Sequence, residues 1–266
     1  MVLSSNNIPD SKGTNAYLRD KSFSKLLEYY CGKELFEQVE NKFIELGEVV
    51  GSELEELALS ADKNPPKLKK RSRVGELSND IEKHPDFIKI EKFAFEKFGL
   101  AAMSHRHGVF GMQQPLPPIV KYGLTFLFVQ SEFGLCCPLS MTDSLTRTLT
   151  KFGDKKLIDK FFDQLTSQDL DHLFQGAMFM TEQHAGSDVG SIDTYAEYED
   201  GNWFLTGDKW FCSNPDADLA MVLARHNKKI SGTKGLALFL LPKKLENGDL
   251  NNYEILTFFI KGPNLQ

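Results

Sequence analysis

The chain has 266 residues, 41% of them hydrophobic and 26% charged, a composition typical of a globular protein with room for one large or two ordinary domains. The formal net charge of −6 excludes a generic nucleic-acid coat protein, because such proteins are basic. The sequence contains no run of about 18 apolar residues and no early signal segment, so we expect a cytoplasmic protein without membrane insertion.

Residues 1–17 are polar and are expected to form an arm ahead of a helical part of the chain. From Asp20 to Leu59 the apolar residues recur at the spacing of amphipathic helices, and Gly32 marks a break between two of them. Further helices are predicted at 87–109, 120–133, 142–152 and 156–165. The chain up to about Leu173 is therefore predicted to be all-α.

A basic cluster follows Asn64-Pro65-Pro66, where the prolines end the helical run. It consists of Lys67, Lys69, Lys70, Arg71 and Arg73. One interpretation is a patch that binds phosphate or nucleic acid, and the other is a solvated linker. The linker is favoured, because no aromatic residues are interleaved to stack on bases.

No metal site and no disulfide framework is predicted. His105 and His107 lie two positions apart, and residues with that spacing do not share a face of a helix. The cysteines lack CxxC spacing and fit reduced core thiols. They are Cys31, Cys136, Cys137 and Cys212.

The residue pattern changes at Gly176, after which β-branched and aromatic residues increase. Strands are expected at 194–198, 203–205, 209–213, 219–225, 235–241 and 253–260, with a hairpin turn at Asp200-Gly201. The sequence thus predicts an α+β fold, an N-terminal all-α domain followed by a small antiparallel β-barrel or sandwich. The expected limits are 1–60 for the arm and helical extension, 61–175 for the helical domain and 176–266 for the β domain.

The stretch Met178–Asp188, MFMTEQHAGSD, combines an apolar run with hydroxyls at Thr181 and Ser187 and a glycine at Gly186. Such a loop suits hydrogen bonding to the edge of a planar ring and then to a phosphate. An ordinary exit from a strand, with a helix N-cap at Ser187 or Asp188, explains the same residues. The residues alone leave both interpretations open.

Two motifs together resemble the acyl-CoA dehydrogenase family. MTEQHAGSD is similar to the family's Thr-Glu-x-x-Ala-Gly-Ser-Asp loop at the junction of its helical and β domains, and GDKWFCSNPDAD at 207–218 is similar to its Gly-x-Lys-x-aromatic segment. The likeness is greatest to the AidB-type alkylation-response branch. That likeness rests on ADKNPPKL at 61–68, KHPDF at 83–87, GLCCPLSMT at 134–142 and Gln183 in place of a common proline.

The resemblance implies that FAD is bound. The backbone of Met180 and Thr181 and the Thr181 hydroxyl would bond the pyrimidine edge of the flavin, while Gly186 and Ser187 would approach the pyrophosphate. Ser187 would also reach the CoA part of a substrate. The cofactor-binding residues expected from the family are Met178, Phe179, Met180, Thr181, Gly186, Ser187, Phe211, Cys212 and Ser213.

Several residues in these motifs also have purely structural interpretations. Trp210 and Phe211 alone would be expected in a strand core, and Cys212 as a buried apolar residue. His184 is expected to be an exposed loop residue, and Glu182 to have a structural role.

The family's C-terminal four-helix bundle carries the catalytic carboxylate, and residues 258–266 depart from the family pattern, so we expect a fragment without a catalytic residue. The resemblance implies that the full-length parent is an FAD-dependent oxidoreductase for CH–CH bonds of acyl-CoA-type thioesters, with an electron acceptor and a homo-oligomeric state. Two alternatives are an AidB-like protein that protects DNA from alkylation, binding it through the missing C-terminal part, and an inactive remnant.

Overall fold

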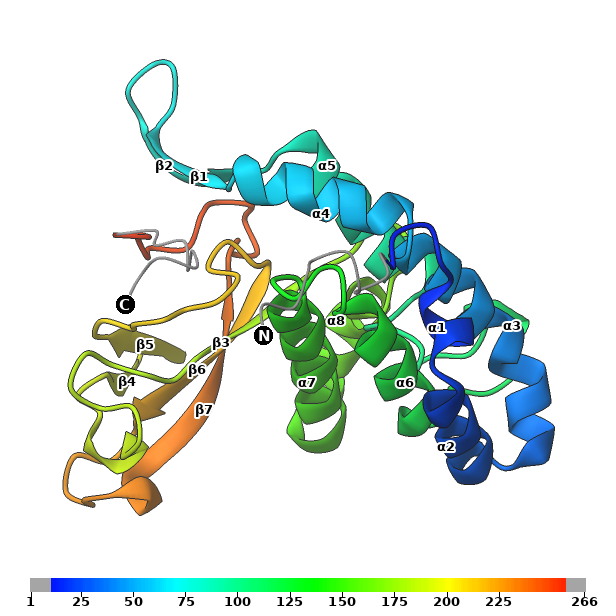
Figure 1. The fold of residues 1–266 in the computed structure, drawn as a ribbon. Coiled ribbons are helices and arrows are strands. Elements are labelled where there is room, and N and C mark those ends of the chain that lie inside the picture. The colour runs from blue at the N-terminus through cyan, green and yellow to red at the C-terminus, as the bar shows by residue number, and fades with distance from the viewer. Residues whose placement is uncertain (1–10, 257–266) are drawn as a thin grey trace, which may run out of the picture. The chain divides into compact units, whose positions relative to one another are not determined.

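The computed structural model describes residues 11–256, so the predicted arm lies mostly outside it and the predicted strand at 253–260 lies partly outside it. The chain forms two compact units (Figure 1). Unit 1 contains residues up to 66 together with 83–136, and unit 2 contains 67–82 together with the chain from 137 onward.

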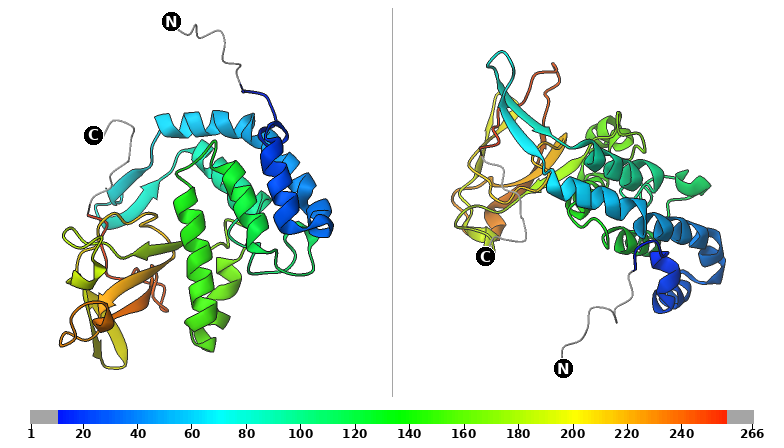
Figure 2. Two further views of the ribbon diagram at one scale, coloured as in Figure 1. Left: turned by 60° about the horizontal axis from the view of Figure 1, so that its bottom comes forward. Right: turned by 45° about the horizontal axis from the view of Figure 1, so that its top comes forward.

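Unit 1 is helical, as predicted. Its elements are α1 (Ala16–Arg19), α2 (Lys21–Cys31), α3 (Lys33–Val50), α4 (Glu53–Lys63), α5 (Pro85–Glu91), the π-helix η2 (Lys92–Lys97), the short 3₁₀ helix η3 (Val109–Gly111) and α6 (Pro118–Phe128). Helices α2 and α3 form a helical hairpin broken at Gly32, and they lie side by side in both views of Figure 2. The Asp20 carboxylate caps α2 by accepting hydrogen bonds from Ser22 N and Phe23 N.

The predicted helix at 87–109 was wrong in its second half, because regular helix ends at Lys97. Gly99 adopts a φ of +53°, a left-handed conformation that ends helices and that glycine takes without strain. The apolar residues that suggested more helix, such as Phe98 and Met103, are fully buried in turns instead. A run of core residues can fill a packed turn as well as a helix.

The basic cluster is an antiparallel hairpin of β1 (Lys67–Arg71) and β2 (Leu77–Glu82), so the prediction of a linker was wrong. Cross-strand partners carry opposite charges: Lys67 faces Glu82 and Lys69 faces Asp80, and the Lys69 ammonium lies 3.0 Å from a Glu82 carboxylate oxygen. These pairs stabilise the ladder and neutralise part of the cluster.

Unit 2 contains α7 (Cys136–Phe152), α8 (Lys155–Leu165) and a five-stranded sheet. Its strands are β3 (Gly176–Phe179), β4 (Tyr195–Glu199), β5 (Asn202–Thr206), β6 (Leu219–Arg225) and β7 (Leu236–Pro242). Strand β6 pairs with β7 in antiparallel register along its whole length. On its other side β6 pairs in parallel with β3, and it also forms a single parallel bridge with β4. The α+β class is confirmed, but the pairing is mixed because the chain crosses over between β3 and β6.

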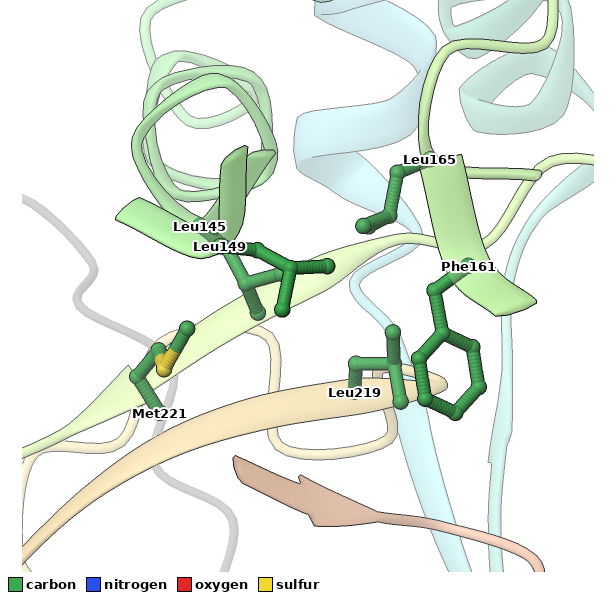
Figure 3. Packing of buried hydrophobic residues seen from close by; sticks show 6 residues of the cluster. All are labelled: Leu145, Leu149, Phe161, Leu165, Leu219 and Met221. Atoms are coloured by element: carbon green, nitrogen blue, oxygen red, sulfur yellow. The ribbon is translucent and has the colours of Figure 1, made fainter. Parts of the chain in front are cut away.

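The main core of unit 2 lies between the sheet and its two helices (Figure 3). Leu145 and Leu149 lie one turn apart on α7, and Phe161 and Leu165 one turn apart on α8, so each pair shares a helix face. They pack on one face of β6, where Leu219 and Met221 alternate with Ala220 and Val222 on the other. Among residues 11–256, no helix has the length and apolar character needed to cross a bilayer.

Leu219→Ala should lower the free energy of unfolding by about 2–5 kcal/mol, because it opens a cavity beneath both helices. Urea unfolding followed by circular dichroism measures the change. Leu250→Ala, at a position that is 53% exposed, is the control and should change stability by no more than about 0.5 kcal/mol. Equal effects of the two substitutions would contradict this account of the core.

Candidate flavin site

Two loops of unit 2 contain the two sequence motifs. Loop A is residues 180–188, directly after β3, and loop B is residues 207–216, between β5 and β6. The Trp210 backbone N–H donates a 2.8 Å hydrogen bond to the Thr181 carbonyl. The fold therefore joins the two motifs side by side.

Loop A makes a tight turn that returns on itself. Glu182 N–H donates to the Ala185 carbonyl at 2.9 Å, and Ala185 N–H donates back to the Glu182 carbonyl at 3.2 Å. Beyond the turn, the Asp188 side chain accepts from Gly190 N–H and caps the short 3₁₀ helix η4 (Val189–Ser191). The N-cap expected at Ser187 or Asp188 is therefore present at Asp188, and it coexists with the turn.

A buried ion pair connects the loops. The Lys209 ammonium lies 2.9 Å from Glu182 Oε1, and the two side chains are 8% and 4% exposed. Lys209 also donates to the Met180 carbonyl at 3.1 Å. The Glu182 carboxylate accepts from the backbone N–H groups of Asp193, at 2.7 Å, and Thr194, at 3.0 Å, and from the Thr194 hydroxyl. This network supports the expected structural role of Glu182.

Glu182 is ionised at neutral pH. Burial by itself would raise the pKa of Glu182, but hydrogen bonds from Thr194, Lys209 and Asp193 outweigh it and lower that pKa to about 2. Burial lowers the pKa of Lys209, and the adjacent Glu182 carboxylate opposes part of that change. A buried carboxylate with this many donors remains charged.

Loop B is irregular, so the strand predicted at 209–213 was wrong. Phe211 and Asn214 adopt φ values of +56° and +55°, which are incompatible with an extended strand. The Asn214 side-chain amide donates to Gln175 Oε1 at 3.1 Å and to the Gly176 carbonyl at 3.2 Å, which holds the loop against the start of β3. Tertiary hydrogen bonds thus override the local strand propensity of this segment.

Gly207 begins loop B at a point of close backbone approach. Its φ is +151°, and a Cβ placed there would lie 2.7 Å from Thr194 Cα. Only glycine fits this position, which keeps loop B against the segment that hydrogen-bonds Glu182.

The side chains of Met178 and Phe179 are used in packing. Met178 packs against the core cluster of α7 and α8, and Phe179 is buried with Ala177 on the other face of the sheet. The buried Phe179 side chain is therefore unavailable to a ligand, while Met178 is partly exposed. The next residue, Met180, is half-buried, and its carbonyl already accepts from Lys209.

Three hydroxyls of the two loops have no hydrogen-bond partner within the described part of the chain: those of Thr181, Ser187 and Ser213.

Gly186 of loop A is not crowded by the rest of the chain. A Cβ at this position would meet only Thr181 Cγ2, at the ordinary contact distance of 3.5 Å. Packing within the chain does not require glycine here, and close approach of a ligand backbone or phosphate would.

The aromatic residues of loop B are not core residues, contrary to the expectation from the residues alone. Phe211 is 75% exposed and Trp210 is 39% exposed, and the left-handed backbone at Phe211 breaks the alternation of a strand at this point. Cys212 packs against Ala177 and its neighbours, and burial raises the pKa of its thiol to about 11. Cys212 thus behaves as the expected partly buried apolar residue.

His184 lies at the tip of loop A with a half-exposed side chain, as expected, and its Nε2 is 3.3 Å from Asp193 Oδ2. Together with Glu182 these residues form a group of three close ligand atoms. The Glu182 oxygens already accept from the Lys209 ammonium and from two N–H groups, so an added cation would compete with a buried lysine.

A family model of the N-terminal domain of the adaptive response protein AidB matches residues 6–172, and a model of the acyl-CoA dehydrogenase middle domain matches residues 177–253. The chain belongs to the acyl-CoA dehydrogenase family, in its AidB branch. Acyl-CoA dehydrogenase family member 11 of Caenorhabditis elegans is 30% identical over 251 residues, which are 91% of this chain and 40% of that protein. AidB of Escherichia coli is 30% identical over 225 residues, which are 77% of this chain and 38% of AidB.

The fold agrees with this assignment to the acyl-CoA dehydrogenase family. A crystal structure of C. elegans ACDH-11 in complex with C11-CoA superposes with a TM-score of 0.81 at 28% identity, covering 97% of this chain and 44% of that one. The chain thus spans about 40% of the length of the curated relatives it matches.

Sequence reasoning missed the part played by Lys209. The signal was present in the two family motifs, since Glu182 follows Thr181 in one and Lys209 follows Gly207-Asp208 in the other. Opposite charges in two motifs that are expected to meet predict an ion pair between them. The partner Thr194 carries no such signal, because it lies in neither motif.

The ion pair should make stability depend on pH in the acidic range. The Glu182 pKa of about 2 lies below its ordinary value of 4.5, so its stabilisation is complete above about pH 5 and is lost as the pH falls through 2. Glu182→Gln should be destabilised at pH 7 by roughly 3 kcal/mol, and this difference from the wild type should shrink toward pH 2. Urea unfolding midpoints of the wild type and the variant, measured from pH 7 to pH 2, check this prediction. A difference between the two that does not change with pH would contradict it.

Gly207→Ala should lower the free energy of unfolding by about 1–3 kcal/mol, because alanine strains the backbone and meets Thr194. Gly186→Ala is the matched control, since its Cβ finds only ordinary contact, and should change stability by about 0.5 kcal/mol or less. Thermal unfolding of both variants measures the two changes in stability. Equal losses of stability would contradict the distinction between a glycine in close contact and an uncrowded one.

Proposed function

We propose that this chain provides the flavin-contacting part of an FAD-dependent oxidoreductase that acts on CH–CH bonds of acyl-CoA-type thioesters. The observation that carries the proposal is the pair of joined loops, which have three hydroxyls without a hydrogen-bond partner among residues 11–256 and an exposed aromatic ring at Phe211. Membership of the acyl-CoA dehydrogenase family supports the same chemistry.

The residues of the two loops fit the parts of FAD. Thr181 offers a hydroxyl next to the main chain of Met180, which suits the pyrimidine edge of the ring. Gly186 and Ser187 offer an uncrowded backbone and a hydroxyl, which suit a pyrophosphate. On loop B, Phe211 offers an apolar wall, with Cys212 and Ser213 next to it. When bound, FAD would supply the acceptor for a hydride from the substrate's β-carbon.

The substrate proposal rests on the relatives. The ACDH-11 structure contains C11-CoA, which supports an acyl-CoA ligand here, with Ser187 near its CoA part. Glu182 is unsuited to removing the α-proton, because Lys209 and two N–H groups occupy its oxygens and a pKa of about 2 makes it a weak base. The base, the electron acceptor and the homo-oligomeric state are proposed for the whole protein.

A protective role toward alkylated DNA is the second candidate, because the AidB N-terminal model matches most of the chain. The net charge of −6 gives this chain no electrostatic preference for DNA. Salt-dependent binding of duplex DNA by the whole protein, without bleaching of its flavin by acyl-CoA, would favour this role over dehydrogenation.

FAD titration of the purified chain tests the proposal. Flavin fluorescence should be quenched on binding, and Phe211→Ala and Thr181→Val should each weaken binding about tenfold, the loss of one stacking or hydrogen-bonding contact. Phe204→Ala, at an exposed aromatic position on β5, is the control and should bind like the wild type. Absence of FAD binding by the wild type, or equal effects of Phe204→Ala and Phe211→Ala, would overturn the site.

A further inference from the structure

Lys209 donates to two groups of loop A at once. Its ammonium contacts the Met180 carbonyl at 3.1 Å and Glu182 Oε1 at 2.9 Å, and its side chain is 8% exposed. An ammonium has three donors, so most of its hydrogen-bonding capacity is directed to one short segment. The intervening residue, Thr181, is thereby held from both sides.

Consecutive residues of loop B bond consecutive carbonyls of loop A. Lys209 bonds the Met180 carbonyl through its side chain, and Trp210 bonds the Thr181 carbonyl through its backbone N–H at 2.8 Å. This arrangement fixes the register of one loop against the other. It sets where the Thr181 hydroxyl lies relative to Phe211, the next residue of loop B.

Net stabilisation is a weak explanation for this pair. The desolvation of two buried charges offsets much of their attraction, and neutral replacements of similar volume are often tolerated without loss of stability. The specific consequence of the pair is geometric, because the carboxylate anchored by Asp193, Thr194 and Lys209 can occupy only one position.

We infer that Lys209, anchored by Glu182, is a positioning residue that sets the spacing between the Thr181 hydroxyl and the Phe211 ring required to bind a flavin. This inference rests on the proposed function. Lys209 itself does not contact the ligand, since its charge is buried against Glu182.

The decisive variant is the double substitution Glu182→Gln with Lys209→Met. It removes both charges together and leaves no unpaired buried charge, and the glutamine oxygen keeps an acceptor for one of the two backbone N–H groups of Asp193 and Thr194. The matched control is Glu197→Gln with Lys228→Met, which removes an exposed pair 3.1 Å apart in the same unit. Both are made in a Trp203→Phe background, so that Trp210 is the only tryptophan.

Two readouts are measured beside cooperative urea unfolding. The first is acrylamide quenching of Trp210 without FAD, which reports whether loop B still lies against loop A. The second is the Kd for FAD, with the visible circular dichroism of the bound flavin. The double variant should unfold cooperatively, with Trp210 quenching at least doubled, FAD binding at least tenfold weaker and an altered flavin signal. The control pair should match the background in all three.

Wild-type quenching and FAD affinity in the folded double variant would overturn the inference. If the background protein binds no FAD, the proposed function fails for this chain, while Trp210 quenching still decides whether the pair positions loop B. If the double variant does not fold, Lys209→Met and Lys209→Arg replace it. Arginine keeps the hydrogen-bond donors, so Lys209→Arg should bind FAD more tightly and show less acrylamide quenching of Trp210 than Lys209→Met. The reverse order would assign Lys209 a packing role only.

Discussion

The buried ion pair between Glu182 and Lys209 is the interaction on which the candidate site depends. It joins a turn after β3 to a loop before β6, and the backbone N–H groups of Asp193 and Thr194 hold the carboxylate from the opposite side. A charge enters a protein interior only with such a set of partners. The pair therefore fixes three segments of the chain at one point.

The two loops joined by the ion pair are attached to neighbouring strands of one sheet, β3 and β6. Strand β6 is buried on both faces. The leucines of α7 and α8 pack on one face. On the other, Ala220 and Val222 belong to a cluster with Ala177 and Phe179 of the neighbouring strand β3 and with Cys212 of loop B. Because β3 and β6 run parallel, loop A leaves β3 in the direction in which β6 continues, away from the end at which loop B enters β6. Loop B is brought to loop A by its own hydrogen bonds, from Asn214 to Gly176 and from Trp210 to Thr181.

The chemistry of the two loops is divided between their inside and their surface. Their buried charged groups, Glu182 and Lys209, neutralise each other in the interior. Their outward side chains include hydroxyls and the Phe211 ring beside the exposed carboxylates of Asp188 and Asp208. Hydroxyl donors and an aromatic ring suit a flat heterocycle. The division also explains why Glu182, although it lies in a family motif, is unsuited to proton abstraction.

The sequence by itself determined the α+β class and the family. It also determined the helices α2, α3, α7 and α8 and the strands β4, β6 and β7. Periodicity, turn residues and the two motifs are local signals and can be recognised without the tertiary structure. It did not determine that 209–213 is a loop, that Phe211 is exposed, or that the basic cluster is a hairpin. Those features were decided by the tertiary structure, since each depends on partners distant in the chain: Thr181 and Gly176 for loop B, and Asp80 and Glu82 for the basic strand. A strand-like pattern yields to such hydrogen bonds, because its intrinsic preference is worth only about 1 kcal/mol.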